Sequence, residues 1–192
     1  MTKIVLASAS PRRKSLLEWA ELEFDILSRE TAESFPPGMN PTDAAVFIAR
    51  GKAHATQEMD LYKRYEHHIP VLAADTIVVL DGDIICKPAN REEAINILSK
   101  LSGKKHLVIT GVVILLDEKE ISFSDTTEVV FHHISFNDIC YYVDKYKPFD
   151  KAGAYAIQEW IGVVGIKSIN GDFYNVMGLP VSRVVNALAD NF

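Results

Sequence analysis

The chain has 192 residues and a formal net charge of −6, and 48% of its residues are apolar while 24% are charged. This length predicts one domain or two closely packed lobes within residues 1–192. An acidic chain lacks the basic surface on which general nucleic-acid binding depends, so we expect no nucleic-acid partner.

The sequence has no feature typical of export or of membrane insertion. Its first apolar stretch is too short for the core of a signal peptide, and no apolar run approaches a membrane span. Cys86 and Cys140 lie far apart and belong to no Cys-x-x-Cys pair, which is typical of a reducing compartment. We therefore expect a cytoplasmic protein without a membrane partner.

Strands and helices are expected to alternate in the first half of the chain. Residues 3–7 read as a buried strand, and Ser10 and Pro11 suit the N-cap and the first position of a helix that buries Leu16 and Leu17. The next expected elements are a strand over 24–27, a loop over 34–41, a helix from Pro41 or Thr42 to about residue 59, and a buried strand over 71–80.

In the second half, two long neighbouring strands are the main feature. The expected elements are a turn at 81–83 with a short strand after it, a helix capped by Asn90 and ending at 101, paired strands over 106–116 and 121–131, a helix capped by Ser135, a strand over 162–169, a turn over 170–176 and a closing helix over 180–189. The segment DKAGAYAIQ, residues 150–158, has no clear assignment. This order favours an α/β fold with a mixed β-sheet flanked by helices.

The segment SASPRR, residues 8–13, places two arginines where a strand gives way to a helix. Backbone N–H groups and the helix dipole favour an anion at such a point. Ser8 and Ser10 add hydroxyl groups, and Arg12 and Arg13 add guanidinium groups that match the geometry of phosphate. The pattern fits a phosphate site, and it equally fits a capped helix with two surface arginines.

Asp75 and Lys52 are unusual because each falls among apolar residues. Asp75 lies inside the strand VLAADTIVVL, where a carboxylate is rarely buried unless it is paired or bound to a metal. Lys52 follows Ala45, Ile48 and Ala49 on one helix face. A lysine whose ammonium group simply reaches solvent would give the same pattern.

Other polar residues are weaker signals taken one by one. Glu33 precedes a proline-rich loop, Lys87 lies in a loop before a proline, and Gln158 follows small residues that allow close approach of a ligand to the backbone. Taken together, the basic candidates would bind an oligo-anion, and Glu33 and Asp75 would bind a hard cation such as Mg²⁺. The combination indicates a nucleotide or another polyphosphate, although the chain has no P-loop and no dinucleotide fingerprint.

Several stretches in order resemble the Maf family of nucleoside triphosphate pyrophosphatases, namely LASASPRRKSLL, AADTIVV, LSGKKHLVITGVVI, DKAGAYAIQ and INGDFYNVMGLP. The resemblance implies a fold related to the inosine triphosphate pyrophosphatases, as a single domain over residues 1–192 with two closely packed lobes and a cleft between them. It also implies hydrolysis of a nucleoside triphosphate to the monophosphate and pyrophosphate with a divalent cation, Mg²⁺ or Mn²⁺. Dimers occur in the family, so a homodimer is an expectation carried by the resemblance.

The resemblance also implies roles for individual residues. Asp75 matches the family's catalytic carboxylate, described as a proton acceptor, and would either take the proton of the attacking water or orient that water through the metal. The other positions matching the family's site are Ser8, Arg13, Glu33, Lys52 and Lys87, with Glu33 and Asp75 toward the metal and Lys52 and Lys87 in catalysis. Positions tied to substrate choice are Arg12, Thr76 and Gln158.

The motifs SPRR, ADT and AIQ agree with the family members that act on dTTP and UTP, with CTP or modified pyrimidine nucleotides as further candidates. The 7-methyl-GTP type carries an aromatic residue for the first arginine, SDQ for ADT and a glutamate for the glutamine. Two positions depart from the family pattern, since Ala32 replaces an acidic residue and Cys86 replaces a common glycine. The alternatives are a pyrophosphatase for other modified nucleotides and a nucleotide-sensing protein that acts in septum formation.

Overall fold

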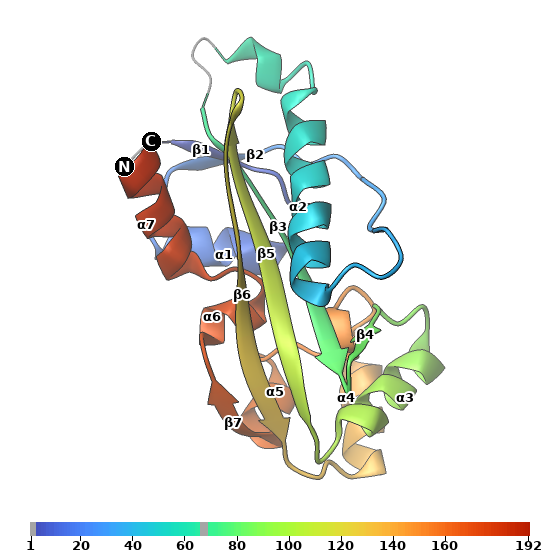
Figure 1. The fold of residues 1–192 in the computed structure, drawn as a ribbon. Helices are drawn as coiled ribbons and strands as arrows, with labels where there is room; N and C mark the ends of the chain where they lie inside the picture. Colours follow the sequence, from blue (N-terminus) through green and yellow to red (C-terminus); the bar gives the residue numbers. More distant parts are fainter. Residues whose placement is uncertain (1–2, 66–68) are drawn as a thin grey trace. The chain divides into compact units, whose positions relative to one another are not determined.

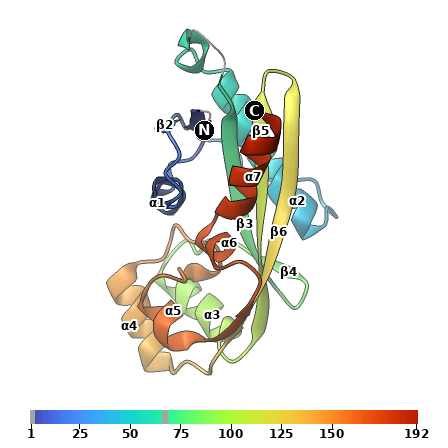
Figure 2. The ribbon, with the colours of Figure 1, turned by 90° about the vertical axis from the view of Figure 1, so that its left-hand side faces the viewer.

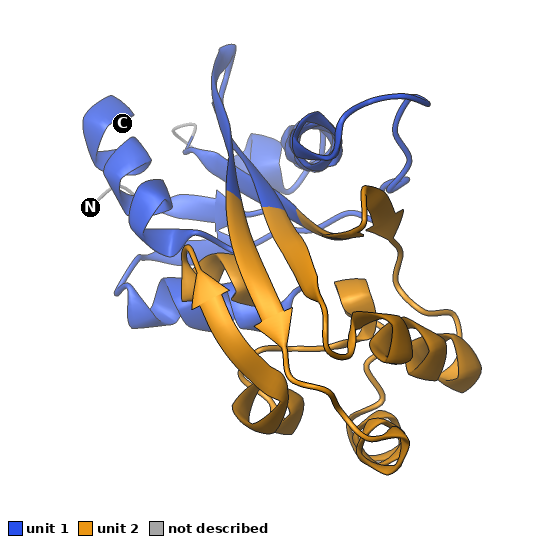
Figure 3. Ribbon diagram, turned by 60° about the horizontal axis from the view of Figure 1, so that its bottom comes forward, with its two compact units in different colours: residues 1–75, 110–125, 178–192 blue, residues 76–109, 126–177 orange. Residues whose placement is uncertain are grey.

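The computed structural model describes residues 3–65 and 69–192, and the chain divides into two compact units (Figure 3). Unit 1 comprises Met1–Asp75, Thr110–Asp125 and Gly178–Phe192, and unit 2 comprises Thr76–Ile109 and Thr126–Met177. The expectation of a single domain with two closely packed lobes and a cleft stays a prediction.

Unit 1 is built on short parallel strands near the N-terminus (Figure 1). Its elements are β1 (Ile4–Leu6), α1 (Pro11–Trp19), β2 (Phe24–Ile26), α2 (Pro41–Gln57), the 3₁₀ helix η1 (Tyr62–Arg64), α7 (Val181–Asn191) and parts of β3 (Val71–Leu80), β5 (Lys105–Leu116) and β6 (Lys119–Phe131). Strand β1 pairs in parallel with both β2 and β3, with Val5 opposite Asp25 and Val71. Helix α2 lies on one side of these strands, and α1 and α7 lie on the other (Figures 1 and 2).

The core of unit 1 fixes α2 closely against the sheet. Ala49 and Ala53 of α2 pack with Val5, Ala73 and Val113 in one fully buried cluster. Small alanine side chains allow a helix to approach a sheet closely, which places the remaining side chains of that face directly over the strands.

Unit 2 contains the other ends of the long strands, with helices that pack on one another. Its own elements are β4 (Asp83–Ile85), α3 (Arg91–Leu101), α4 (Phe136–Tyr146), the 3₁₀ helix η2 (Ala152–Ala154), α5 (Trp160–Gly165), β7 (Ile166–Asn170) and α6 (Phe173–Met177). Strand β4 is antiparallel to β3, and β7 is antiparallel to β6.

The hydrogen-bonded strand order is β2-β1-β3-β5-β6-β7, with β4 added on β3, so the predicted mixed sheet flanked by helices is confirmed. The predicted caps are also confirmed, because Ser10, Asn90 and Ser135 each accept a hydrogen bond from the third residue of their helix. Within the ranges 3–65 and 69–192, no helix is both long and apolar enough to cross a membrane.

Two predicted elements of unit 2 are wrong. The strand expected over 162–169 begins only at Ile166, because residues 160–165 form α5. A β-carbon on Gly162 would lie 1.8 Å from the Ile157 carbonyl oxygen, so a close backbone approach overrides the strand preference of Val163 and Val164. The turn expected over 170–176 ends early, since Phe173 starts the short helix α6.

Candidate active site

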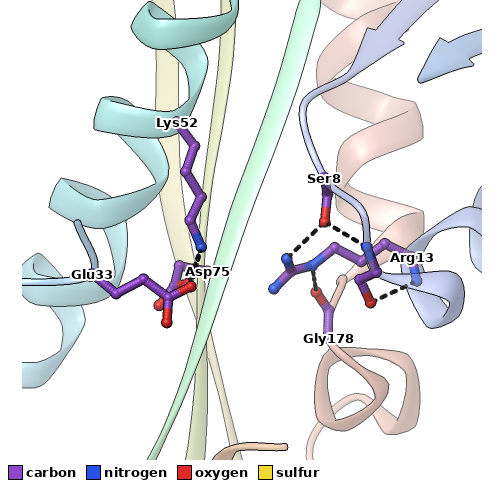
Figure 4. Close-up of polar contacts among 7 residues, drawn as sticks. Ser8, Arg13, Glu33, Lys52, Asp75 and Gly178 are labelled. Carbon is purple, nitrogen blue, oxygen red and sulfur yellow. Dashed lines mark hydrogen bonds and ion pairs between the residues drawn. The ribbon is translucent and has the colours of Figure 1, made fainter. Parts of the chain in front are cut away.

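Lys52, Asp75 and Glu33 meet at one point of unit 1 (Figure 4). The Lys52 Nζ donates to Asp75 Oδ1 at 2.6 Å and to Glu33 Oε1 at 2.8 Å. The side chains of Lys52 and Asp75 are only 15% and 8% exposed, whereas that of Glu33 is 40% exposed. One ammonium group therefore bridges a buried carboxylate and a carboxylate open to solvent.

Local structure explains why Lys52 reaches Asp75. Helix α2 buries Ala45, Ile48 and Ala49 on the sheet, and Lys52 extends the same face by one turn. The helix face that carries Lys52 is thus directed at β3, in which Asp75 is the fifth residue. Of the two possibilities for a carboxylate buried in this strand, a partner or a metal, the structure shows a partner for Asp75, the Lys52 ammonium. That ammonium contacts two carboxylates rather than only solvent.

Arg13 forms a second part of the site, at the start of α1. Its guanidinium group is buried, and its Nε donates to the Gly178 carbonyl at 2.8 Å while its Nη1 donates to Ser8 Oγ at 3.1 Å. Ser8 Oγ also accepts from the Ser10 N–H at 3.2 Å. Arg13 is thus held in one orientation, and the interpretation as a surface arginine does not apply to it.

The charges of these two parts act on one another. Burial lowers the pKa of Arg13 below its ordinary value, and the carboxylates of Asp75 and Glu33 counter part of that effect while Arg12 adds to it. In Figure 4 the Arg13 guanidinium points toward the side of unit 1 that carries Lys52 and Asp75. Unit 1 therefore places buried positive charge from two elements around a pair of carboxylates.

The residues present fit a divalent cation that is shared with a bound phosphate. Glu33 and Asp75 offer carboxylate oxygens, the donors that Mg²⁺ and Mn²⁺ prefer, and both reach the same ammonium group. Among the residues that the structure describes, no three His, Cys, Asp or Glu side chains group closely enough to hold a metal by themselves. Mg²⁺ usually keeps waters and substrate oxygens as its other ligands, so two carboxylates are sufficient.

The other predicted residues fall elsewhere. Arg12 is half-buried in α1, next to Arg13. Thr76, Lys87 and Gln158 belong to unit 2, where Thr76 follows Asp75 in β3, and Lys87 and Gln158 are exposed in a loop and a turn. Unit 1 thus brings together Ser8, Arg13, Glu33, Lys52 and Asp75.

Sequence reasoning missed Gly178, whose carbonyl accepts the hydrogen bond from Arg13. Its φ of +118° suits glycine, since other residues rarely adopt that conformation. The signal in the sequence was a lone glycine before Leu179 and Pro180, which marks a turn before a helix but does not indicate which side chain its carbonyl meets.

A sequence profile of the family described as Maf-like protein matches residues 3–191. The chain belongs to the Maf-like family. Its Maf-like relatives include a dTTP/UTP pyrophosphatase of Cytophaga hutchinsonii, 49% identical over 100% of this chain and 85% of that protein. Another dTTP/UTP pyrophosphatase, from Parabacteroides distasonis, is 46% identical over 97% of this chain and 94% of that protein.

This Maf-like chain is also similar to the crystal structure of a nucleoside-triphosphatase / dITP/XTP pyrophosphatase from Mycobacterium abscessus. That similarity has a TM-score of 0.38 and 18% identity, and it covers 69% of this chain and 75% of the other. At this level the similarity carries no conclusion about activity.

Proposed function

We propose that the chain is a nucleoside triphosphate pyrophosphatase that hydrolyses dTTP and UTP to the monophosphate and pyrophosphate. The main support for the proposal is that the Lys52 ammonium contacts both Asp75 and Glu33. The charge of the buried Arg13 guanidinium interacts with the same two carboxylates. Buried cations beside paired carboxylates suit a substrate with several phosphates and a divalent cation. The names of relatives 46–49% identical to this chain support the choice of nucleotide.

In the proposed reaction, a water oxygen attacks the α-phosphorus and the bond from that phosphorus to the bridging oxygen breaks. The electron pair of the broken bond leaves with pyrophosphate, and the proton of the water passes to Asp75 or to solvent. Asp75 either accepts that proton or holds the water in place, and both roles require hydrogen-bond reach to the water. In the structure, Asp75 Oδ1 accepts a hydrogen bond from the Lys52 ammonium.

The cations of the site would act on the phosphates. Arg13 is held by Ser8 and Gly178, so it offers a fixed guanidinium without reorganisation during the reaction. Lys52 keeps Asp75 and Glu33 close together, and we propose that these two carboxylates hold Mg²⁺ or Mn²⁺. When bound, the cation would neutralise phosphate charge.

The remaining predicted residues also have roles in the proposal. We propose that Lys87 adds charge toward the phosphates, and that Arg12, Thr76 and Gln158 contact the nucleotide and select the base. The described residues contain no disulfide, and Cys86 and Cys140 are free thiols, which supports a cytoplasmic location. The homodimer stays a prediction.

A substrate panel tests the proposed function. Pyrophosphate release should be measured for dTTP, UTP, CTP, ATP, GTP and 7-methyl-GTP, each with Mg²⁺, with Mn²⁺ and with a chelator. We expect release from dTTP and UTP that the chelator abolishes. A preference for 7-methyl-GTP would move the chain to the other substrate type, and tight nucleotide binding without release would favour the nucleotide-sensing alternative.

A further inference from the structure

A short segment of unit 2, Tyr155–Glu159, forms hydrogen bonds with buried polar side chains that the proposed chemistry does not use. Within it Tyr155, Ala156 and Ile157 are buried, whereas Gln158 is exposed. The segment therefore presents one polar side chain on a backbone that is otherwise packed into the unit.

Tyr142 of α4 forms hydrogen bonds with two residues of this segment. Its hydroxyl accepts the Ala156 N–H at 3.2 Å and donates to the Glu159 carboxylate in a short hydrogen bond. Tyr142 is fully buried, so water does not compete for these contacts. A single hydroxyl group thus fixes the residues on both sides of Ile157 and Gln158.

Glu159 is drawn inward by the same network. It occupies the N-cap position of α5, yet its side chain makes no capping hydrogen bond. Its carboxylate instead accepts a hydrogen bond from the Tyr142 hydroxyl, and it lies 3.6 Å from the Nζ of Lys151. Lys151 is itself buried and also contacts Asp150 at 2.8 Å, so the inward turn of Glu159 places its charge beside a cation.

A second buried contact anchors the start of the segment. The Tyr155 hydroxyl lies 2.8 Å from His106 Nε2, and both rings pack edge-on against Phe131. Burial lowers the pKa of His106 to about 4 and raises the pKa of Tyr155. Both groups are therefore neutral near pH 7, and this anchor does not change with pH around neutrality.

The residues just before the segment are held in a strained form. Ala154 has a φ of +59°, which costs energy for a residue with a β-carbon. Gly153 packs so closely that a β-carbon there would lie 2.9 Å from Val78 Cγ2. Strain of this kind persists only where the surrounding contacts leave the backbone no alternative.

We propose that Tyr142, Glu159 and Lys151 are positioning residues that fix the orientation of Gln158 and thereby set the choice among nucleotide bases. The proposal rests on the proposed function, in which Gln158 contacts the base. Hydrogen-bonding groups discriminate strongly only when they are held in place, because a mobile amide adapts to a wrong base at little cost.

The test compares Tyr142→Phe with the matched control Tyr146→Phe. Tyr146 lies on the same helix and stacks on Tyr142 with ring centroids 4.9 Å apart. Both variants lose one hydroxyl, but Tyr142→Phe is the one that removes the contacts to Ala156 and Glu159. A third variant, Glu159→Gln, keeps an acceptor for Tyr142 and removes the charge beside Lys151.

The readouts are amide hydrogen exchange at Ala156 in the nucleotide-free protein and the ratio of kcat/KM for dTTP to that for GTP. We expect Tyr142→Phe to speed exchange at Ala156 and to lower the ratio, each about ten-fold, as loss of one or two hydrogen bonds implies. We expect Glu159→Gln to give a smaller loss, and Tyr146→Phe to match the wild type.

The outcomes separate the two proposals. A wild type that hydrolyses none of the nucleotides would overturn the proposed function itself. If an active, selective wild type keeps its dTTP to GTP ratio in Tyr142→Phe, only the positioning role is overturned. A lower unfolding temperature with an unchanged ratio would overturn the positioning role as well, since it marks a purely structural network.

Discussion

Replacing Asp75 with asparagine separates the chemistry of the site from its contribution to stability. The change keeps the shape of the side chain and removes one negative charge from a group that is 8% exposed. Asp75 Oδ1 and Lys52 Nζ are 2.6 Å apart, so their attraction is roughly 6 kcal/mol at an effective dielectric constant of about 20. The cost of removing both charges from water offsets much of that attraction.

The expected loss of stability is therefore moderate. Breaking a buried ion pair usually costs about 3–5 kcal/mol because one charge is left without a partner. Here Lys52 keeps Glu33 at 2.8 Å, so we expect Asp75→Asn to lower the free energy of unfolding by only about 1–3 kcal/mol. Loss of a general base or of a water-positioning carboxylate should at the same time lower kcat about 10²–10⁴-fold.

The assay pairs urea unfolding with pyrophosphate release from dTTP, and Glu120→Gln is the matched control. Glu120 forms a two-pronged ion pair with Arg50 in unit 1, outside the site residues. Because this pair is partly exposed, its loss should cost about 1 kcal/mol or less and leave kcat unchanged. A kcat for Asp75→Asn within about three-fold of wild type would refute the proposed mechanism, leaving the pair a structural one.

Arg13→Lys should raise KM for the nucleotide about ten-fold, since a lysine cannot replace both guanidinium contacts; an unchanged KM in steady-state kinetics would contradict this. Gly111→Ala should destabilise the protein by about 3 kcal/mol or prevent folding, because its β-carbon would lie 2.3 Å from the backbone of α2. Gly51→Ala has open space and should stabilise α2 by about 0.5–1 kcal/mol, and equal unfolding temperatures for the two variants would be the contrary result. His106 is kept neutral in the fold down to its pKa of about 4, whereas an unfolded histidine takes up a proton near pH 6.5. The free energy of unfolding should therefore fall by up to about 3 kcal/mol as the pH drops from 6.5 to 4, and it should fall less in His106→Gln. If urea unfolding at pH 7 and at pH 4.5 gives the same loss of stability for wild type and His106→Gln, the assignment to His106 is wrong.

Local rules were sufficient for most elements of this chain. Ser10, Asn90 and Ser135 cap the helices that the sequence predicts, because a capping side chain bonds only to its own first turn. The strand over Val71–Leu80 was readable because a ten-residue run that is apolar except at Asp75 and Thr76 needs burial on both faces. Local rules failed around Gly162, where a neighbouring backbone segment lies very close. There the local residue preference predicted a strand, whereas the folded chain forms a helix.

The candidate site was likewise predictable in part from local sequence and in part only from tertiary packing. Residue types and their apolar surroundings already identified Asp75 and Lys52 as unusual, because burying a charge needs a partner, and the resemblance to the Maf family supplied their roles. Only the tertiary structure decided which partner each one takes. Lys52 and Asp75 meet because α2 packs on β3 through small alanines, Glu33 joins them from a loop, and Arg13 is turned inward by a carbonyl 165 residues away. Contacts over such separations depend on the packing of whole elements, and no local pattern of residues determines them.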